Sequence, residues 1–116
     1  MLYTNLKHIE SRDSFKSEID NNENVMICCG RMGPMCLPVY DIMENLEKCE
    51  DHKHISFRDM AFDSNDAGVI RDLPETKGFM SLPFTIYFKN GNLIHATSGI
   101  QSMEQVSSIL DEKFKK

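Results

Sequence analysis

The sequence predicts an α/β fold in which a mixed central β-sheet carries helices on both of its faces. Two patterns support this prediction most directly. Runs of β-branched, aromatic and other apolar residues at 84–88 and 93–97 flank Asn90-Gly91, a pair typical of a tight hairpin turn. Before this hairpin, short apolar runs alternate with segments of helical periodicity. The chain is therefore expected to alternate strands and helices and to end with a hairpin and a last helix.

The first half of the chain contains two strand–helix pairs. A short strand is expected within 2–9, and a helix that Ser11 caps follows it and runs to about Asn21. The apolar run 25–28 has the length of a buried strand. A second helix is expected over 34–49, because apolar residues recur there at helical spacing and proline suits a first helical turn.

The second half adds a third pair, the hairpin and a final helix. Residues 55–62 alternate as a strand until the alternation slips at Asp59 and Met60, and a short helix is expected over 67–73. Ser102 caps the last helix. The order β-α-β-α-β-α-β-β-α implies parallel strands joined by right-handed crossovers first and antiparallel strands at the end. Helices are expected to cover both faces of the sheet.

Composition restricts the class of protein. The whole chain, residues 1–116, fits a single domain. A formal net charge of −5 argues against nucleic acid and anionic membranes as main partners. No apolar run approaches the roughly 20 residues of a membrane span. The N-terminus is too polar for a signal peptide, so we expect a cytoplasmic protein, and we expect a monomer.

Most of the cysteines lie in the strand-to-helix turn at 28–38. Cysteines in a chain without a secretory signal are more typical of buried, metal-binding or redox groups than of a structural disulfide framework. Cys29 follows the strand and Cys36 begins the helix, where the helix dipole favours a thiolate. Gly30 and Gly33 favour a tight turn, which allows the two sulfurs to approach within bonding range.

The segment Ser81-Leu82-Pro83-Phe84-Thr85-Ile86-Tyr87-Phe88-Lys89-Asn90-Gly91 resembles the cis-proline loop, strand and hairpin of the thioredoxin family. The resemblance implies a thioredoxin-like three-layer fold over most of the chain. It also implies a cis peptide bond between Leu82 and Pro83, with Pro83 beside the redox cysteines. In that family the backbone next to the proline pairs with a substrate peptide.

The active-site turn departs from the family pattern. The family carries Trp-Cys-Gly-Pro-Cys, whereas the nearest match here, Met32-Gly33-Pro34-Met35, has methionine at both cysteine positions. The buried aspartate that assists proton transfer in the family has no counterpart within 25–28. The resemblance implies that this Met-Gly-Pro-Met turn, together with Leu82 and Pro83, forms the substrate-binding surface.

These observations predict a thiol–disulfide oxidoreductase that exchanges with a disulfide of a protein partner and is reduced in turn by a reductase. This chemistry implies no cofactor and no resident metal. We predict that Cys29 attacks and Cys36 resolves, and the opposite order stays open. Adjacent strand residues point to opposite faces, so Cys28 is expected to pack in the core. Cys49 continues the apolar stripe of its helix and is expected in the core as well.

Two alternatives remain open. The first is a non-catalytic adapter that keeps the peptide-binding groove, which the methionines at the family's cysteine positions favour. The second is a Cu(I)-handling protein, because Met32, Met35, Cys29 and Cys36 form a set of soft donors of the kind that Cu(I) prefers.

Overall fold

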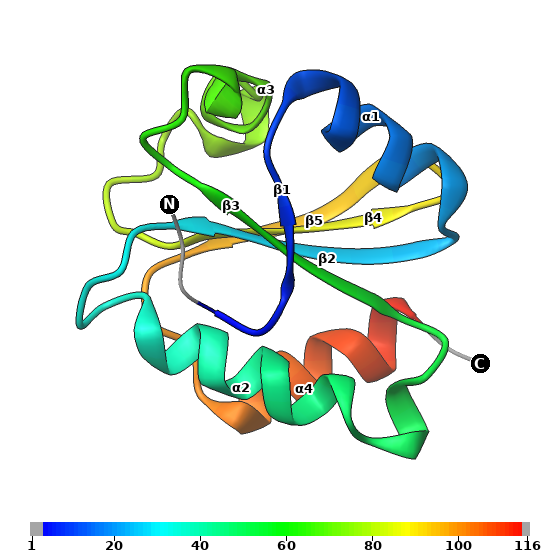
Figure 1. Cartoon of the computed structure of the whole chain (residues 1–116). Coiled ribbons are helices and arrows are strands. Elements are labelled where there is room, and N and C mark those ends of the chain that lie inside the picture. Colours follow the sequence, from blue (N-terminus) through cyan, green and yellow to red (C-terminus); the bar gives the residue numbers. More distant parts are fainter. Residues whose placement is uncertain (1–3, 115–116) are drawn as a thin grey trace.

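The computed structural model describes residues 4–114, so Leu2 of the predicted first strand lies outside the described residues. A five-stranded sheet crosses the molecule in the order β1-β3-β2-β4-β5 (Figure 1). The strands are β1 (Lys7–Ile9), β2 (Asn24–Gly30), β3 (Ser56–Ala61), β4 (Phe84–Lys89) and β5 (Asn92–Ser98). The pairs β1–β3 and β2–β3 are parallel, whereas β2–β4 and β4–β5 are antiparallel. The mixed sheet expected from the element order is confirmed.

Helices cover both faces of this sheet. They are α1 (Arg12–Asn21), α2 (Leu37–Glu47), α3 (Gly68–Arg71) and α4 (Met103–Lys113). Figure 1 shows α1 and α3 on one face and α2 and α4 on the other, which gives the three layers. Single 3₁₀ turns at Glu50–His52, Asn65–Ala67 and Pro74–Thr76 complete the connections. The predicted three-layer α/β fold is confirmed.

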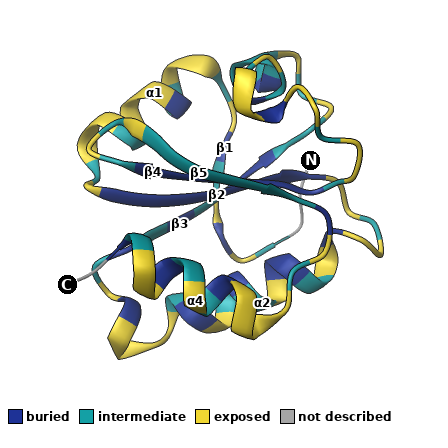
Figure 2. Cartoon of the chain, turned by 180° about the vertical axis from the view of Figure 1, so that it is seen from behind, coloured by how far each residue is buried: buried dark blue, intermediate teal, exposed yellow. Residues whose placement is uncertain are grey.

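Two hydrophobic cores pack against opposite faces of the sheet. The α2–α4 core contains Tyr40 and Met43 from α2 and Leu110 from α4. The α1–α3 core contains Phe15 from α1 and Ile70 from α3. Figure 2 shows that the buried residues of the helices face the sheet and that their outer sides are exposed. Because strand side chains alternate between faces, the β2 residues from Val25 to Cys29 alternate between the two cores.

Local signals placed most element boundaries correctly. Ser11 caps α1 by accepting a hydrogen bond from the Ser14 amide at 3.0 Å. Ser102 caps α4 in a capping box with Gln105. Asn90 and Gly91 have φ angles of 53° and 81°, as the predicted tight hairpin turn requires.

The helix predicted over 34–49 is shorter in the structure. It begins at Leu37, with Cys36 as its N-cap residue, and ends at Glu47. Cys49 therefore lies beyond the helix end and is exposed, so the predicted core position for this residue is wrong. The apolar stripe of α2 stops at Leu46, and the chain turns outward before Cys49 can continue it.

Exposure makes Cys49 the expected first target of a thiol reagent. Brief treatment of the native protein with iodoacetamide should modify Cys49, because the other three cysteines are at most 2% exposed. Peptide mass spectrometry measures the modified residue, and a Cys49→Ser variant is the control. Equal labelling of all four cysteines in the native state would contradict the structure.

Candidate functional site

The candidate site lies where β2 ends. We call Gly30 the floor of the site, because the other groups of the site pack over it. An ideal Cβ placed on Gly30 would lie 2.7 Å from Cys36 Sγ, 2.9 Å from Tyr40 Oη and 3.0 Å from Pro83 Cβ. These three groups come from the turn before α2, from α2 itself and from the loop before β4. They therefore converge on the space that the missing side chain leaves open.

Gly30 provides space at this point. Its φ angle is not in the left-handed region, and neither is that of Gly33. The tight turn instead comes from hydrogen bonds of the Cys36 and Leu37 amides to the Gly33 carbonyl, both at 3.0 Å. The expectation that both glycines serve backbone freedom is therefore corrected: a side chain at Gly30 would collide with the Cys36 sulfur.

The predicted cis peptide bond between Leu82 and Pro83 is present. The Pro83 carbonyl accepts a hydrogen bond from the Gly99 amide at 3.0 Å, which ties this loop to the end of β5. The loop holds Pro83 against Gly30, at the point that the Cys36 sulfur also approaches. This bond and this contact are the features that the thioredoxin resemblance led us to expect.

Arg31 places a hydrogen-bond donor and a positive charge beside Cys36. Its backbone amide donates to Cys36 Sγ at 3.4 Å. Its guanidinium makes two hydrogen bonds of 2.8 Å to the Asp63 carboxylate and lies 5.4 Å from the centre of the Phe62 ring. The side chain is thereby held in place next to the turn that carries the sulfur.

The three turn cysteines divide between the two faces of the sheet. Cys28 and Cys36 belong to the α2–α4 core, whereas Cys29 belongs to the α1–α3 core. The predicted core position of Cys28 is confirmed, since its exposure is 0%. The prediction that Cys29 shares the face of Cys36 is corrected, because strand alternation turns Cys28 to that face instead. All of these cysteines are free thiols.

Burial keeps these thiols protonated. It raises the pKa of Cys29 to about 12, although the charge of Arg71 opposes the shift. It raises the pKa of Cys28 well above its usual value, and the neighbouring sulfurs raise it further. Burial also raises the pKa of Cys36, against the lowering effects of the Arg31 amide and charge. Cys36 is the only one of the three with a stabilising amide hydrogen bond at its sulfur in the described structure.

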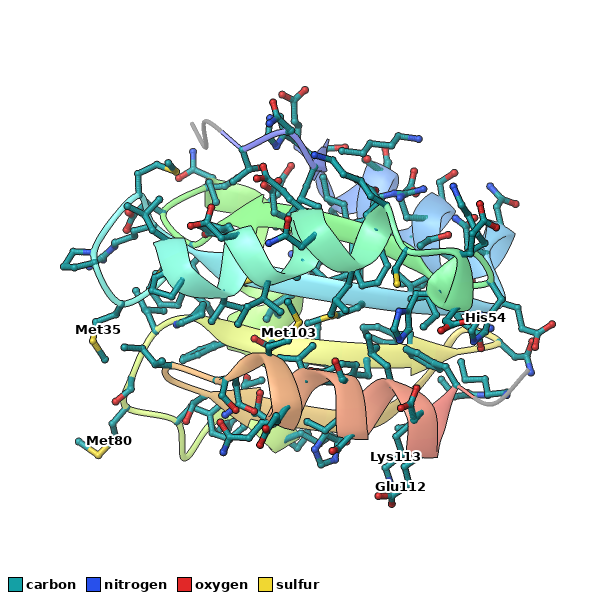
Figure 3. The ribbon with its side chains drawn as sticks, turned by 90° about the horizontal axis from the view of Figure 1, so that it is seen from below. Met35, His54, Met80, Met103, Glu112 and Lys113 are labelled. Atoms are coloured by element: carbon teal, nitrogen blue, oxygen red, sulfur yellow. The ribbon has the colours of Figure 1, made fainter. Side chains whose placement is uncertain are left out.

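Large apolar side chains are exposed on the segments that flank the site in sequence, and we call this set the apolar rim. Its members are Met32, Met35, Leu37, Met80, Ile100 and Met103. They come from the turn before α2 and its first residue, from the loop before Pro83, from the segment after β5 and from the start of α4. Figure 3 shows Met35 and Met80 projecting from the same end of the molecule. Met80 is 97% exposed, which is unusual for a side chain that large and apolar.

Two other kinds of feature, a metal-binding group and a membrane span, are absent from the described residues. Across residues 4–114, no three His, Cys, Asp or Glu side chains are grouped closely enough to hold a metal ion. None of the helices in this part of the chain has the length and apolar character needed to cross a membrane.

Sequence reasoning missed Tyr40, the third group at the site. Its hydroxyl is buried and makes no hydrogen bond within the described residues. The signal was present, because Tyr40 lies one turn after Cys36 and so on the same side of α2. A tyrosine in an otherwise aliphatic stripe marks a place where a polar atom reaches the core.

This combination of a three-layer mixed sheet, a cysteine at the start of the second helix and a cis-proline before the fourth strand defines the thioredoxin fold. Several solved thioredoxin structures match the chain. That of Plasmodium falciparum has a TM-score of 0.70 at 20% identity and covers 93% of this chain and 99% of its own. That of Trypanosoma brucei brucei has a TM-score of 0.76 at 14% identity, with coverage of 99% and 96%.

Thioredoxin O2 of Arabidopsis thaliana, solved in the oxidised state, has a TM-score of 0.75 at 13% identity and covers 98% of each chain. No protein-family model and no curated protein sequence matches the chain. At these identities the comparisons establish the fold alone.

Proposed function

We propose that this protein is a thiol–disulfide exchange protein in which Cys36 is the reacting cysteine. The observation that carries the proposal is the position of the Cys36 sulfur, between the Arg31 amide and the cis-proline Pro83. A sulfur at this place lies beside the apolar rim, where a partner can dock. Burial raises the pKa of Cys36, and the Arg31 amide and charge oppose this shift and so favour the thiolate that exchange requires.

The exchange proceeds in two steps. The Cys36 thiolate attacks one sulfur of a substrate disulfide, forms a mixed disulfide and releases the first substrate thiolate. A second cysteine then loses its proton and attacks the Cys36 sulfur. This attack forms an intramolecular disulfide and releases the second substrate thiolate. The substrate gains two electrons, and a separate reductase returns them to the protein.

The identity of the second cysteine separates two versions of this proposal. The sequence suggests Cys29, which ends the strand. The shared core favours Cys28, which lies on the same face as Cys36 and whose pKa the Cys36 sulfur affects. In both versions Cys36 attacks. Its neighbours in sequence, Met35 and Leu37, are exposed and Cys36 itself is 2% exposed, whereas both strand cysteines have an exposure of 0%.

The proposed partner is a protein with an accessible disulfide flanked by apolar residues. An extended segment of the partner would pair with the backbone next to Pro83, and its side chains would contact the rim. Methionine side chains adapt to different partner surfaces, so the rim suits this role. We further propose a monomer that acts in a reducing compartment such as the cytoplasm, where a reductase regenerates the thiols.

Single cysteine variants test the proposal in a Cys49→Ser background. Cys36→Ser is expected to abolish reduction of insulin by the protein in the presence of dithiothreitol, measured as turbidity. A variant of the resolving cysteine should instead accumulate a mixed disulfide with the substrate through Cys36, detected by mass spectrometry. An unchanged rate in Cys36→Ser would contradict the proposal.

The adapter function is the second candidate, because every cysteine of the site is buried while the rim is exposed. An adapter binds its partner without exchange. It is favoured if Cys36→Ser leaves binding of the partner intact and the wild-type protein reduces no disulfide.

A further inference from the structure

One row of polar residues crosses the sheet beneath α2. Each strand contributes one member: His8, Asp59, Cys28, Thr85 and Thr97. The register pairs His8 with Asp59, Asp59 with Cys28, Cys28 with Thr85 and Thr85 with Thr97. Residues paired in register point to the same face of a sheet, and Cys28 faces the α2–α4 core. The row therefore runs from β1 at the edge of the sheet to Cys28 in β2, and continues to β5.

On the three central strands, this row lies next to apolar positions. The neighbouring positions on the same face carry Met26, Phe57 and Tyr87, all fully buried. Buried polar atoms without partners are rare and costly. The Thr97 hydroxyl, like that of Tyr40, makes no hydrogen bond within the described part of the chain. Packing alone therefore gives no reason for these residue types.

The outer end of the row opens to solvent. Asp59 has an exposure of 0%, and one of its carboxylate oxygens lies 2.5 Å from His8 Nδ1. The other oxygen accepts a hydrogen bond from the Thr4 hydroxyl. The His8 side chain is 27% exposed. A cavity of about 300 Å³ lies over this pair and has both residues in its lining. The buried carboxylate thus has an imidazole between it and water.

The inner end of the row reaches the reacting sulfurs. Asp59 and Cys28 are register neighbours, and the Asp59 charge raises the pKa of Cys28 in addition to the larger effect of burial. The Tyr40 side chain extends from α2 toward Cys28, Cys36 and Asp59. Burial raises the pKa of Tyr40, and the proximity of Cys28, Cys36 and Asp59 raises it further. Its hydroxyl therefore remains a hydrogen-bond donor beside the sulfurs.

We propose that Asp59 accepts the proton that Cys28 loses when Cys28 resolves a mixed disulfide on Cys36, and that His8 passes this proton to water. The Cys28 thiolate then attacks the Cys36 sulfur, a bond forms between the two, and the substrate sulfur leaves with the electron pair of the broken bond. The Tyr40 hydroxyl donates to the thiolate while it exists. This assignment rests on the exchange function proposed above.

The groups that face Asp59 set its proton affinity. They are His8 and Thr4 from the β1 side, Cys28 from β2, and Tyr40 and Glu44 from α2. Burial raises the pKa of Asp59, whereas the hydrogen bonds with Thr4 and His8 lower it, and Glu44 raises it. A carboxylate with a raised pKa is a better acceptor for a thiol proton than an exposed one. Glu10 and Asp63 also line the cavity, as His8 does.

The test follows the resolving step alone, with dithionitrobenzoate as the probe. In a Cys49→Ser background, Cys36 first forms a mixed disulfide and releases one thionitrobenzoate. Attack by the second cysteine then releases another, which is followed by absorbance in stopped flow from pH 5 to 9. Asp59→Asn is expected to slow this second release about a hundredfold, as loss of a general base does, and to remove the inflection in its pH profile.

His8→Gln is expected to slow the second release at least about tenfold and to leave the first release unchanged. Because His8 is partly exposed, this variant should fold even if Asp59→Asn does not. Lys7→Gln is the matched control, since Lys7 lies beside His8 on β1 but is 64% exposed and pairs with Glu18. A second release with the same rate and pH profile in His8→Gln as in Lys7→Gln would overturn the proposal.

Cysteine variants separate failure of this inference from failure of the exchange function. A second release that survives Cys28→Ser and disappears in Cys29→Ser overturns the proton path, while the exchange function stands. Absence of a second release in the Cys49→Ser parent, with all three turn cysteines present, overturns both. Loss of the second release in Cys28→Ser alone supports the assignment of Cys28.

Discussion

Replacing Gly30 with alanine is expected to displace the Cys36 sulfur from its place beside Pro83. The new Cβ would lie 2.7 Å from that sulfur and 3.0 Å from Pro83 Cβ. The sulfur can rotate away, but the proline ring is held by its cis peptide bond and by the hydrogen bond from Gly99. Overpacking of this kind costs about 1–3 kcal/mol of unfolding free energy. This exceeds the roughly 0.4–1 kcal/mol that alanine gains over glycine through the unfolded chain.

Two measurements check this expectation. Chemical denaturation should show the loss of stability, and iodoacetamide should label Cys36 at least about tenfold faster, because a buried thiol reacts only after local opening. Gly33→Ala is the matched control. No atom lies within 4 Å of a Cβ placed on Gly33, so its stability should change by less than about 0.5 kcal/mol. If both variants behave alike, Gly30 is not the floor of the site.

The fold could be predicted from the sequence because its signals are local. The Asn90-Gly91 turn, the serine caps and the alternation of strands with helices each depend on a few neighbouring residues. They agree with one another, and such agreement between levels is typical of a sequence that specifies one fold. Boundaries failed where a tertiary effect decided them. The end of α2 at Glu47 is the main example, since the helical periodicity continued to Cys49.

The site was harder to predict because it depends on which face each strand residue occupies. A shift of one residue exchanges the roles of Cys28 and Cys29, and no local pattern fixes that choice in a strand that is buried on both faces. The register decides it by pairing Cys28 with Asp59 and Thr85. Sequence reasoning had assigned the opposite faces.

Asp59 is a buried carboxylate that the sequence pattern could have indicated. The strand pattern 55–62 slips at Asp59 and Met60, and the sequence suggested an irregular strand or an early end. In the structure β3 is regular through both positions, and Asp59 faces the core where an apolar residue was expected. The segment 25–28 contains no carboxylate, whereas the parallel register brings one from the neighbouring strand. A charged residue at an inward strand position indicates a functional group.

Placing a charge on the apolar rim is expected to reduce exchange with a protein partner far more than exchange with a small disulfide. Met80 is 97% and Met35 46% exposed, and both project from the same end of the molecule. If a partner covers them, glutamate at either position must be desolvated on binding. Loss of a central apolar contact costs about 2 kcal/mol or more, so Met35→Glu and Met80→Glu should each lower kcat/KM for insulin at least about tenfold.

Cystamine, a small disulfide with no side chains to contact the rim, is the comparison substrate. Its rate should fall much less, because it needs only the Cys36 sulfur and not the surface around it. Ser17→Glu adds the same charge on α1, which covers the opposite face of the sheet, and should leave both rates near those of the wild type. Equal losses with insulin and cystamine would mean that the glutamates act on the sulfur electrostatically. Unchanged insulin reduction in both methionine variants would place the docking surface elsewhere on the molecule.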